Sequence, residues 1–387
     1  MEIKEVYAKV VKDSRKEETI KVIVKTSKGW FETSAPSGKS KGRFEVKDYA
    51  NGLRSDIKFI NSLDLAELNG LLIGKFEDLL KLEKKIRGQL GGNSLFALEA
   101  SILKALAWED GKELWEFLGG IKIPHPVGNT IGGGLHSRGK KEIKPDFQEF
   151  LFVSGCRSFK RCVKINNIAY KLAGKMIRVA GRNDEGAWET DQTNEEVLEI
   201  MTQIQDIIKE KYGERIEIGL DIAASSFYNG NYNYKNPRKR VNKKNQIAYI
   251  RNLIRRYNLF YIEDPLYETD MSGFAELNKE KGFIVGDDLI ATNPERLKKA
   301  IRLRAISALI VKPNQIGSLL KVKEVINLCK QFNIKTIISH RSGETKDDTI
   351  ADLGVGFSCD FIKTGIYGKV RKAKLKRLMH IEKRLKK

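Results

Sequence analysis

Six short apolar segments in the second half of the chain each end at a charged or titratable residue, and this pattern limits the fold more than any other feature. Short apolar segments bounded in this way are typical of buried strands. Helical apolar spacing at 293–303 and 317–332 separates several of them. The residues at the six ends are Asp221, Glu263, Asp287, Lys312, His340 and Lys363.

The spacing of these ends indicates one strand and one helix in each repeat. After Glu263, successive ends lie 23 to 28 residues apart, which is the length of one strand-helix unit. In a (β/α)8 barrel of the TIM type, the C-terminal ends of the strands share one face, and catalytic residues lie there. We therefore predict an α/β fold in which the six residues converge on one face of such a barrel.

The first part of the chain predicts a separate α+β domain. Apolar and polar residues alternate within 1–35, which is typical of three antiparallel strands. Helical apolar spacing then extends over about 66–118. We expect an N-terminal domain at 1–120 that carries a mobile loop, and a barrel domain at 121–387.

Composition excludes several classes of protein. With 387 residues and a hydrophobic content of 41%, the chain is long enough to bury a sizeable core. No apolar run approaches the length of a membrane span, and the N-terminus lacks a signal-peptide core, so we expect a cytoplasmic protein with no membrane association. Four cysteines without paired spacing argue against a disulfide scaffold or a zinc finger.

The formal net charge of +21 favours anionic partners. Basic residues cluster at 235–244 and at 363–387, where eleven Lys or Arg accompany one acidic residue, Glu382. Neither cluster contains interleaved aromatic residues or a known nucleic-acid-binding motif. Two interpretations remain open for the C-terminal tail: a solvated surface, or a patch that binds polyanions weakly.

Three of the six strand ends carry carboxylates, at Asp221, Glu263 and Asp287. Converging oxygen ligands suit octahedral Mg²⁺ better than zinc. Lys312 follows them, and a lysine beside a bound metal can have its pKa lowered enough to act as a general base. The predicted face is therefore suited to removing a proton next to a carboxylate group, whose developing charge the metal would accept.

Two loops add candidate anion-binding groups. Arg341 and Ser342 follow the strand end at His340, and a guanidinium with a hydroxyl can grip a phosphate or carboxylate. The loop 36–42 superficially resembles a phosphate-binding P-loop, but that motif requires Gly where Thr33 stands. A mobile lid that carries Ser40 remains as the functional interpretation of this loop.

Ten short motifs, in order along nearly the whole chain, resemble those of the enolase family, the 2-phosphoglycerate dehydratases. They include Pro36-Ser37-Gly38-x-Ser40, Gly133-Gly134-x-His136, Gln148-Glu149-Phe150, Asp184-Glu185-Gly186, Ile262-Glu263-Asp264-Pro265, Gly286-Asp287-Asp288-Leu289, Lys312-x-Asn314-Gln315 and Ile362-Lys363-Thr364-Gly365. The resemblance implies an enolase-like barrel and the reversible, Mg²⁺-dependent dehydration of 2-phosphoglycerate to phosphoenolpyruvate.

The resemblance also implies two Mg²⁺ ions in each active site. Asp221, Glu263 and Asp287 would be ligands of the first ion. Ser40 would be a ligand of the second, which arrives with the substrate. Lys312 would remove the proton at carbon 2 of the substrate.

Roles for the remaining residues follow from the same resemblance. Glu185, supported by Glu149, would act on the departing 3-hydroxyl group. His136 and His340 would line the closed site. Arg341 and Ser342 would bind the substrate's phosphate, and Lys363 would contact its carboxylate. His136 and Glu149 would also contact the substrate.

The chain departs from the family pattern in several places. The segment Asp13-Ser14-Arg15 matches the family, but the residues after it do not. The resemblance implies a homodimer, yet a Glu that pairs across the subunit interface in the family has no equivalent here. The main hypothesis is a working enolase. The alternatives are an enolase-like paralogue that acts on another anionic carboxylic acid and a non-catalytic polyanion-binding protein.

Overall fold

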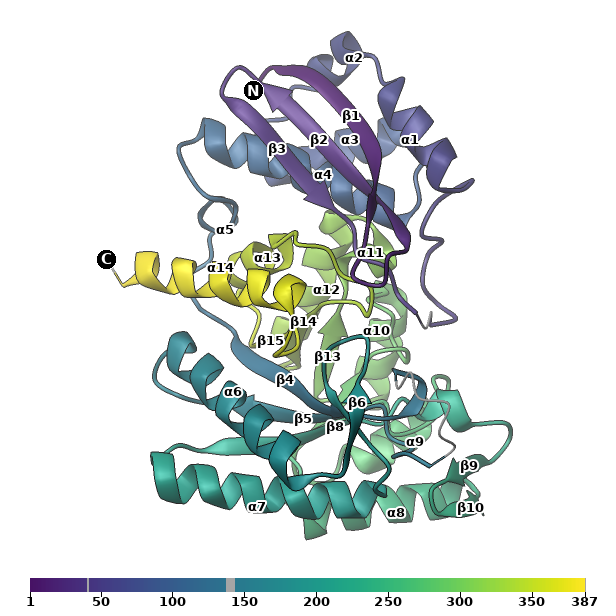
Figure 1. The fold of residues 1–387 in the computed structure, drawn as a ribbon. Coiled ribbons are helices and arrows are strands. Elements are labelled where there is room, and N and C mark those ends of the chain that lie inside the picture. Colours follow the sequence, from purple (N-terminus) through teal and green to yellow (C-terminus); the bar gives the residue numbers. More distant parts are fainter. Residues whose placement is uncertain (40–41, 137–142, 387) are drawn as a thin grey trace.

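The computed structural model describes residues 1–39, 42–136 and 143–386, without the side chain of His136. A small sheet with its helices lies above a closed barrel in the view of Figure 1. No helix in these ranges is long and apolar enough to cross a membrane.

The N-terminal part begins with a three-stranded antiparallel sheet in the order β1-β2-β3, as predicted. Its strands are β1 (Ile3–Lys12), β2 (Glu18–Thr26) and β3 (Gly29–Ser34). Helix α4 (Gly92–Glu109) covers one face, where Ser101 donates a hydrogen bond to the backbone oxygen of Val22. Val22 and Val24 are fully buried, so the alternating pattern of β2 marks the face that packs on the helix.

The predicted helical region 66–118 forms several helices. Besides α4 they are α2 (Leu65–Gly70), α3 (Leu79–Ile86) and α5 (Leu114–Phe117), and α1 (Leu53–Asn61) precedes them. Turns with left-handed residues such as Leu72 and Arg87 separate these helices.

Eight strands close into the predicted barrel, and every one of the six predicted segments is a strand. The eight are β4 (His125–Gly132), β5 (Glu149–Ser154), β8 (Ile216–Asp221), β11 (Tyr261–Glu263), β12 (Phe283–Gly286), β13 (Ala308–Val311), β14 (Lys335–Ser339) and β15 (Phe361–Lys363). Closure occurs where β15 pairs in parallel with β4, with Phe361 opposite His125.

Strand β5 differs from the regular parallel repeat, because it runs antiparallel to both β4 and β8. A parallel pair requires a crossover that is usually a helix, whereas an antiparallel pair needs only a loop. The described part of 133–148 contains only the short 3-10 helix η2 (Gly134–His136). The reversal places the first residue of β5, Glu149, opposite Asp221 at the end of β8.

The interior of the barrel holds its own apolar cluster. Small and branched residues such as Ala308 and Ile310 point inward with Tyr261 and Phe361. Their neighbours along the strands, such as Leu309, face outward and join the main core. This packed layer supports the polar residues at the strand ends from below.

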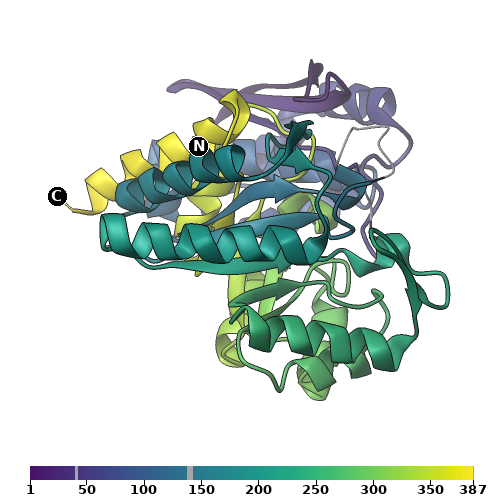
Figure 2. The same ribbon diagram turned by 60° about the horizontal axis from the view of Figure 1, so that its bottom comes forward.

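Helices surround the barrel (Figures 1 and 2). They are α6 (Phe159–Met176), α7 (Asn194–Tyr212), α8 (Lys243–Arg256), α9 (Met271–Leu277), α10 (Pro294–Leu303), α12 (Leu319–Gln331), α13 (Thr349–Gly356) and α14 (Lys369–Leu385), with the short α11 (Pro313–Ile316). The two predicted helices at 293–303 and 317–332 are thus α10 and α12. Strands β6 (Val179–Arg182) and β7 (Trp188–Thr190) extend the sheet beside β4.

The basic segment 235–244 lies largely in a hairpin. Its strands are β9 (Tyr232–Lys235) and β10 (Arg238–Val241), and helix α8 begins directly after them.

The N-terminal part is joined to the barrel loop that follows β14. Ser37 and Gly343 exchange two backbone hydrogen bonds, of 2.7 and 2.8 Å. Ser14 donates a third, of 2.7 Å, to the backbone oxygen of Glu344. A side chain at position 343 would overlap Asp13 and Ser37, so this contact requires glycine.

We predict that Gly343→Ala lowers the free energy of unfolding by about 1–3 kcal/mol, because the added methyl group overpacks this junction. Urea unfolding followed by circular dichroism measures the change. Gly155→Ala is the matched control, since a methyl group there meets no atom within 4 Å. Equal stability of the two variants would contradict a tight junction.

Candidate active site

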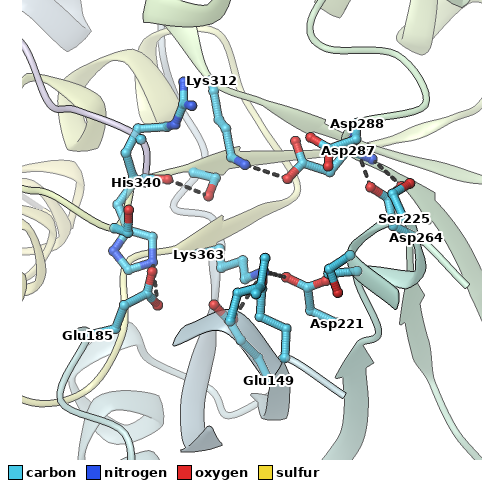
Figure 3. Close-up of a pocket in the computed structure, with 18 of the residues that line it drawn as sticks. Glu149, Glu185, Asp221, Ser225, Asp264, Asp287, Asp288, Lys312, His340 and Lys363 are labelled. Carbon is cyan, nitrogen blue, oxygen red and sulfur yellow. Dashed lines mark hydrogen bonds and ion pairs between the residues drawn. The ribbon is translucent and has the colours of Figure 1, made fainter. Parts of the chain in front are cut away.

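A pocket of about 210 Å³ opens at the C-terminal ends of the parallel barrel strands (Figure 3). Gly38 of the N-terminal part also lines it. The predicted site residues that line it are Glu149, Glu185, Asp221, Asp287, Lys312, His340, Arg341, Ser342 and Lys363.

Three predicted site residues are not among the described residues that line the pocket. Ser40 lies outside the residues that the structure describes. His136 ends helix η2, but its side chain is not described. Glu263 is fully buried and accepts a hydrogen bond of 2.8 Å from Lys363, which lines the pocket.

Lys363 carries the central positive charge of the site. Its Nζ atom lies 2.8 Å from Glu263 Oε2, 3.0 Å from Asp221 Oδ2 and 3.1 Å from Glu149 Oε2. Burial alone would lower the pKa of Lys363, but the carboxylates, above all Asp221, raise it well above its usual value. The lysine therefore stays charged and allows three acidic side chains to be buried together.

Glu263 has the properties of an unsatisfied metal ligand. Within the described structure, its buried Oε1 atom has no hydrogen-bond partner, whereas Oε2 accepts a hydrogen bond of 2.5 Å from the hydroxyl of Tyr261. Burial and then the charge of Asp221 raise the pKa of Glu263 well above its usual value. A divalent cation at Oε1 would supply the missing partner and favour the charged form.

Lys312, at the end of β13, forms a short ion pair with Asp287, at the end of β12. Burial would lower the pKa of Lys312, but Asp287 outweighs burial and raises it. The carboxylate faces the lysine directly and stabilises its charged form. The lowering of this pKa by a bound metal stays a prediction.

A second acidic group lies beside Asp287. Carboxylate oxygens of Asp264, Asp287 and Asp288 lie within 4.8 Å of one another, close enough to hold a metal ion. Both carboxylate oxygens of Asp264 already accept a hydrogen bond, of 3.0 and 2.8 Å, from the backbone nitrogens of Asp287 and Asp288. Burial, and then Asp287, raise the pKa of Asp288 to about 7.

The ammonium groups of Lys363 and Lys312 contact the predicted ligands Asp221, Glu263 and Asp287. Each lysine contributes one positive charge, so the carboxylates outnumber the cations. An all-oxygen donor set with excess negative charge fits a hard divalent cation such as Mg²⁺. The residues present therefore fit the predicted metal.

Arg341 extends from the loop after β14 and is buried. Its Nη1 and Nη2 atoms donate to the two carboxylate oxygens of Glu45, at 2.8 and 3.0 Å. Such a bidentate pair fixes the plane of the guanidinium. Glu45 is a site residue that the sequence analysis missed, since nothing in its local pattern separates it from an ordinary surface Glu.

Ser342 is positioned by two donors from the N-terminal part of the chain. Its Oγ atom accepts hydrogen bonds from Arg15 Nη1, at 3.1 Å, and from the backbone nitrogen of Lys39, at 2.8 Å. Because a hydroxyl oxygen has two lone pairs, both acceptor positions are then used. The hydroxyl proton remains free to donate to an anion in the pocket.

Glu185 lies in the turn between β6 and β7. Asn183 Oδ1 accepts hydrogen bonds of 3.0 Å from the backbone nitrogens of Glu185 and Ala187, which fixes the turn. The Oε2 atom of Glu185 accepts a hydrogen bond of 3.2 Å from Asn129 and lies 3.6 Å from Nε2 of His340. The acidic turn that sequence alone would assign to the surface thus reaches the pocket.

Comparison with known proteins agrees with this geometry. Residues 120–387 match the sequence family described as the enolase C-terminal TIM barrel domain. An enolase of Thermoplasma acidophilum is 37% identical, over 98% of this chain and 98% of its own length. The chain belongs to the enolase family.

Other enolases show the same degree of similarity. An enolase of Methanosphaera stadtmanae is 37% identical over 99% of this chain and 97% of its own length. An enolase of Archaeoglobus fulgidus is 34% identical over 99% of this chain and 97% of its own length.

The basic C-terminal tail of this enolase-family chain is partly internal. Lys363, Arg371 and Lys374 are buried, and Lys374 Nζ lies 2.5 Å from Glu344 Oε2 and 2.6 Å from the backbone oxygen of Thr345. A charge count could not separate these residues from the exposed lysines around them. The available signal was the helical spacing of 371 and 374, which places them on the apolar side of α14.

We predict that Lys363→Met lowers the free energy of unfolding by about 3–5 kcal/mol in the presence of a chelator, because it leaves three buried carboxylates without their cation. Added Mg²⁺ should restore part of this loss. Urea unfolding with and without Mg²⁺ measures both effects.

Lys335→Met is the control for this change. Lys335 lies on the neighbouring strand β14, and its side chain, 39% exposed, pairs with Asp360 at 3.3 Å. Removing this exposed pair should cost less than about 1 kcal/mol. If both variants lost equal stability, Lys363 would not be the cation on which the acidic cluster depends.

Proposed function

We propose that the pocket is the active site in which the chain converts 2-phosphoglycerate to phosphoenolpyruvate and water, and catalyses the reverse reaction. The enolase family of lyases carries out this dehydration. The observation that carries the assignment is that Lys312 and Glu185 approach one pocket from different sides, above a set of buried carboxylates (Figure 3).

Dehydration requires a base and an acid placed in this way. Lys312, as the free amine, takes the proton from carbon 2. The electron pair of that bond first moves onto the adjacent carboxylate group of the substrate. In the next step the bond from carbon 3 to its hydroxyl breaks as the pair returns to form the double bond between carbons 2 and 3. Protonated Glu185, supported by Glu149, gives its proton so that the oxygen leaves as water.

Membership of the enolase family implies a divalent metal ion, and we infer that it is Mg²⁺, with two ions for each site. Asp221, Glu263 and Asp287 would hold the first, and Ser40 would be a ligand of the second, which arrives with substrate. When bound, the metal would neutralise Asp287, which lowers the pKa of Lys312, and would stabilise negative charge on the substrate's carboxylate.

The substrate is a small phosphorylated molecule, and the pocket offers separate side chains for its phosphate and for its carboxylate group. Arg341 and the free hydroxyl proton of Ser342 would bind the phosphate, while Lys363 would contact the carboxylate. His136 and His340 would line the closed site. This phosphate-binding pair favours 2-phosphoglycerate over an anionic carboxylic acid that has no phosphate.

We further infer a two-domain chain, with residues 1–120 as the N-terminal domain and 121–387 as the catalytic barrel, that forms a homodimer in the cytoplasm. The exposed side chain of Trp30 on edge strand β3 offers apolar surface for a subunit contact. The four cysteines are free thiols in the structure, which agrees with a reducing compartment.

We predict that Lys312→Ala lowers turnover of 2-phosphoglycerate about 10²–10⁴-fold, because the variant lacks the base. The ultraviolet absorbance of phosphoenolpyruvate follows the reaction, and a chelator should stop it in the wild type. Lys335→Ala, on the next strand, should retain activity. A well-folded wild-type protein that forms no phosphoenolpyruvate with Mg²⁺ would contradict the proposed function.

A second function, weak binding of the nucleic-acid backbone, is favoured by two rows of lysines. Helices α6 and α14 lie side by side (Figures 1 and 2), and Glu382 of α14 accepts a hydrogen bond of 2.8 Å from the backbone nitrogen at the start of α6. Exposed lysines that make no ion pair with any described residue follow both helices: Lys160, Lys164, Lys171 and Lys175 on α6, and Lys369, Lys372, Lys376 and Lys383 on α14. The exposed ring of Tyr367 lies beside Lys372, whose Nζ atom is 5.8 Å from the ring centroid. Rows in which lysines predominate would contact phosphates rather than bases.

We predict that a variant in which four exposed lysines of the two rows are replaced binds labelled single-stranded RNA at least about 10-fold more weakly, because each change removes a cation that can contact a phosphate. The four changes are Lys164→Glu, Lys171→Glu, Lys372→Glu and Lys376→Glu. Fluorescence anisotropy at low salt measures the affinity. A control variant replaces four exposed lysines of the N-terminal part and so has the same change in charge. Its changes are Lys4→Glu, Lys9→Glu, Lys58→Glu and Lys84→Glu. Equal losses in both variants would assign the binding to net charge alone.

A further inference from the structure

Arg371 is a buried arginine on α14 that the reaction scheme above does not use. Its side chain is among the largest fully buried ones, with 1% of the residue exposed. Nη1 lies 2.7 Å from Nδ1 of His340 and 2.8 Å from the backbone oxygen of Arg341, and Nη2 lies 2.8 Å from the backbone oxygen of Ser342. One guanidinium therefore contacts three consecutive residues of the active-site loop.

The contact with His340 determines where the imidazole carries its proton. A guanidinium has only donor groups and remains protonated in proteins. The Nδ1 atom of His340 must therefore be the acceptor, through its lone pair. A neutral ring with an unprotonated Nδ1 carries its single proton on Nε2.

The charged groups around His340 agree with a neutral ring. Burial, and then the charge of Arg371, hold the pKa of His340 well below its usual range. Lys363 and Lys374 act in the same direction, and Glu185 acts against them. Three cations thus oppose one carboxylate around a fully buried imidazole.

The protonated Nε2 faces Glu185. The distance from Nε2 to Glu185 Oε2 is 3.6 Å, and Asn129 donates to that same oxygen at 3.2 Å. A protonated Nε2 attracts this oxygen, whereas an unprotonated Nε2 would present a lone pair to it. The orientation of the proposed acid would then depend on the tautomer of His340.

We propose that Arg371 is a positioning residue that holds His340 as the neutral Nε2–H tautomer, so that His340 orients Glu185 and exchanges no proton with substrate. The role assigned to Glu185 rests on the proposed function, whereas the tautomer does not. A spectroscopic test therefore separates failure of this inference from failure of the proposed reaction.

The test is long-range ¹H–¹⁵N correlation NMR of the imidazole rings in the full chain labelled with ¹⁵N-histidine. The chain has four histidines, so the spectrum is simple, and His340→Gln assigns the signal of His340. We expect the pattern of an unprotonated Nδ1 and a protonated Nε2, unchanged as the pH passes through about 6.5, where an ordinary histidine titrates.

Arg371→Met should abolish this pattern, so that His340 shows mixed tautomers or titrates, while Arg371→Lys, which keeps a cationic donor, should retain an unprotonated Nδ1. Arg377→Met is the matched control, because Arg377 lies on the same helix and pairs with Asp352 at 2.6 Å without touching His340. Its spectrum should match that of the wild type.

Several results would overturn the proposal. A wild-type His340 with its proton on Nδ1, or one that titrates near pH 6.5, would do so even if Arg371→Met failed to fold. An unchanged pattern in a folded Arg371→Met variant would show that Arg371 only supports the loop.

Discussion

The ammonium group of Lys363 is the interaction on which the rest of the site depends. It lies among carboxylates from three other strands, β5, β8 and β11, and each would be costly to bury without a cation. Lys363 reaches them because β15 closes the barrel against β4. The strand that completes the barrel therefore also carries the cation that the acidic cluster needs.

Two further cations around the pocket each pair with a carboxylate. Lys312 pairs with Asp287, and Arg341 pairs with Glu45. A metal ion or a phosphorylated substrate must compete with these pairs for its own contacts. Because Glu45, Arg15 and the backbone of Lys39 come from the N-terminal part of the chain, the side of the pocket that carries Arg341 and Ser342 is complete only when both parts are in contact.

Much of the barrel could be predicted because six of its strands end at or directly before a polar or charged residue, and these residues lie on one face. The spacing of such residues along the chain therefore indicates the order of the strands. The direction of β5 could not be predicted, since an apolar run reads the same in both directions. Glu45 and Arg371 were also missed, because their roles come from contacts with residues about 300 and 30 positions away, respectively. The motifs of the family located most of the predicted residues that line the pocket, but not the residues that hold these side chains in place.

Hydrogen exchange at carbon 2 of 2-phosphoglycerate tests the central claim, that Lys312 removes this proton and Glu185 acts in a later step. Proton NMR in deuterated water with Mg²⁺ follows the loss of the signal from carbon 2. The account predicts exchange in the wild type and in Glu185→Gln, which forms little phosphoenolpyruvate, and none in Lys312→Ala. Exchange that persists in Lys312→Ala would contradict it.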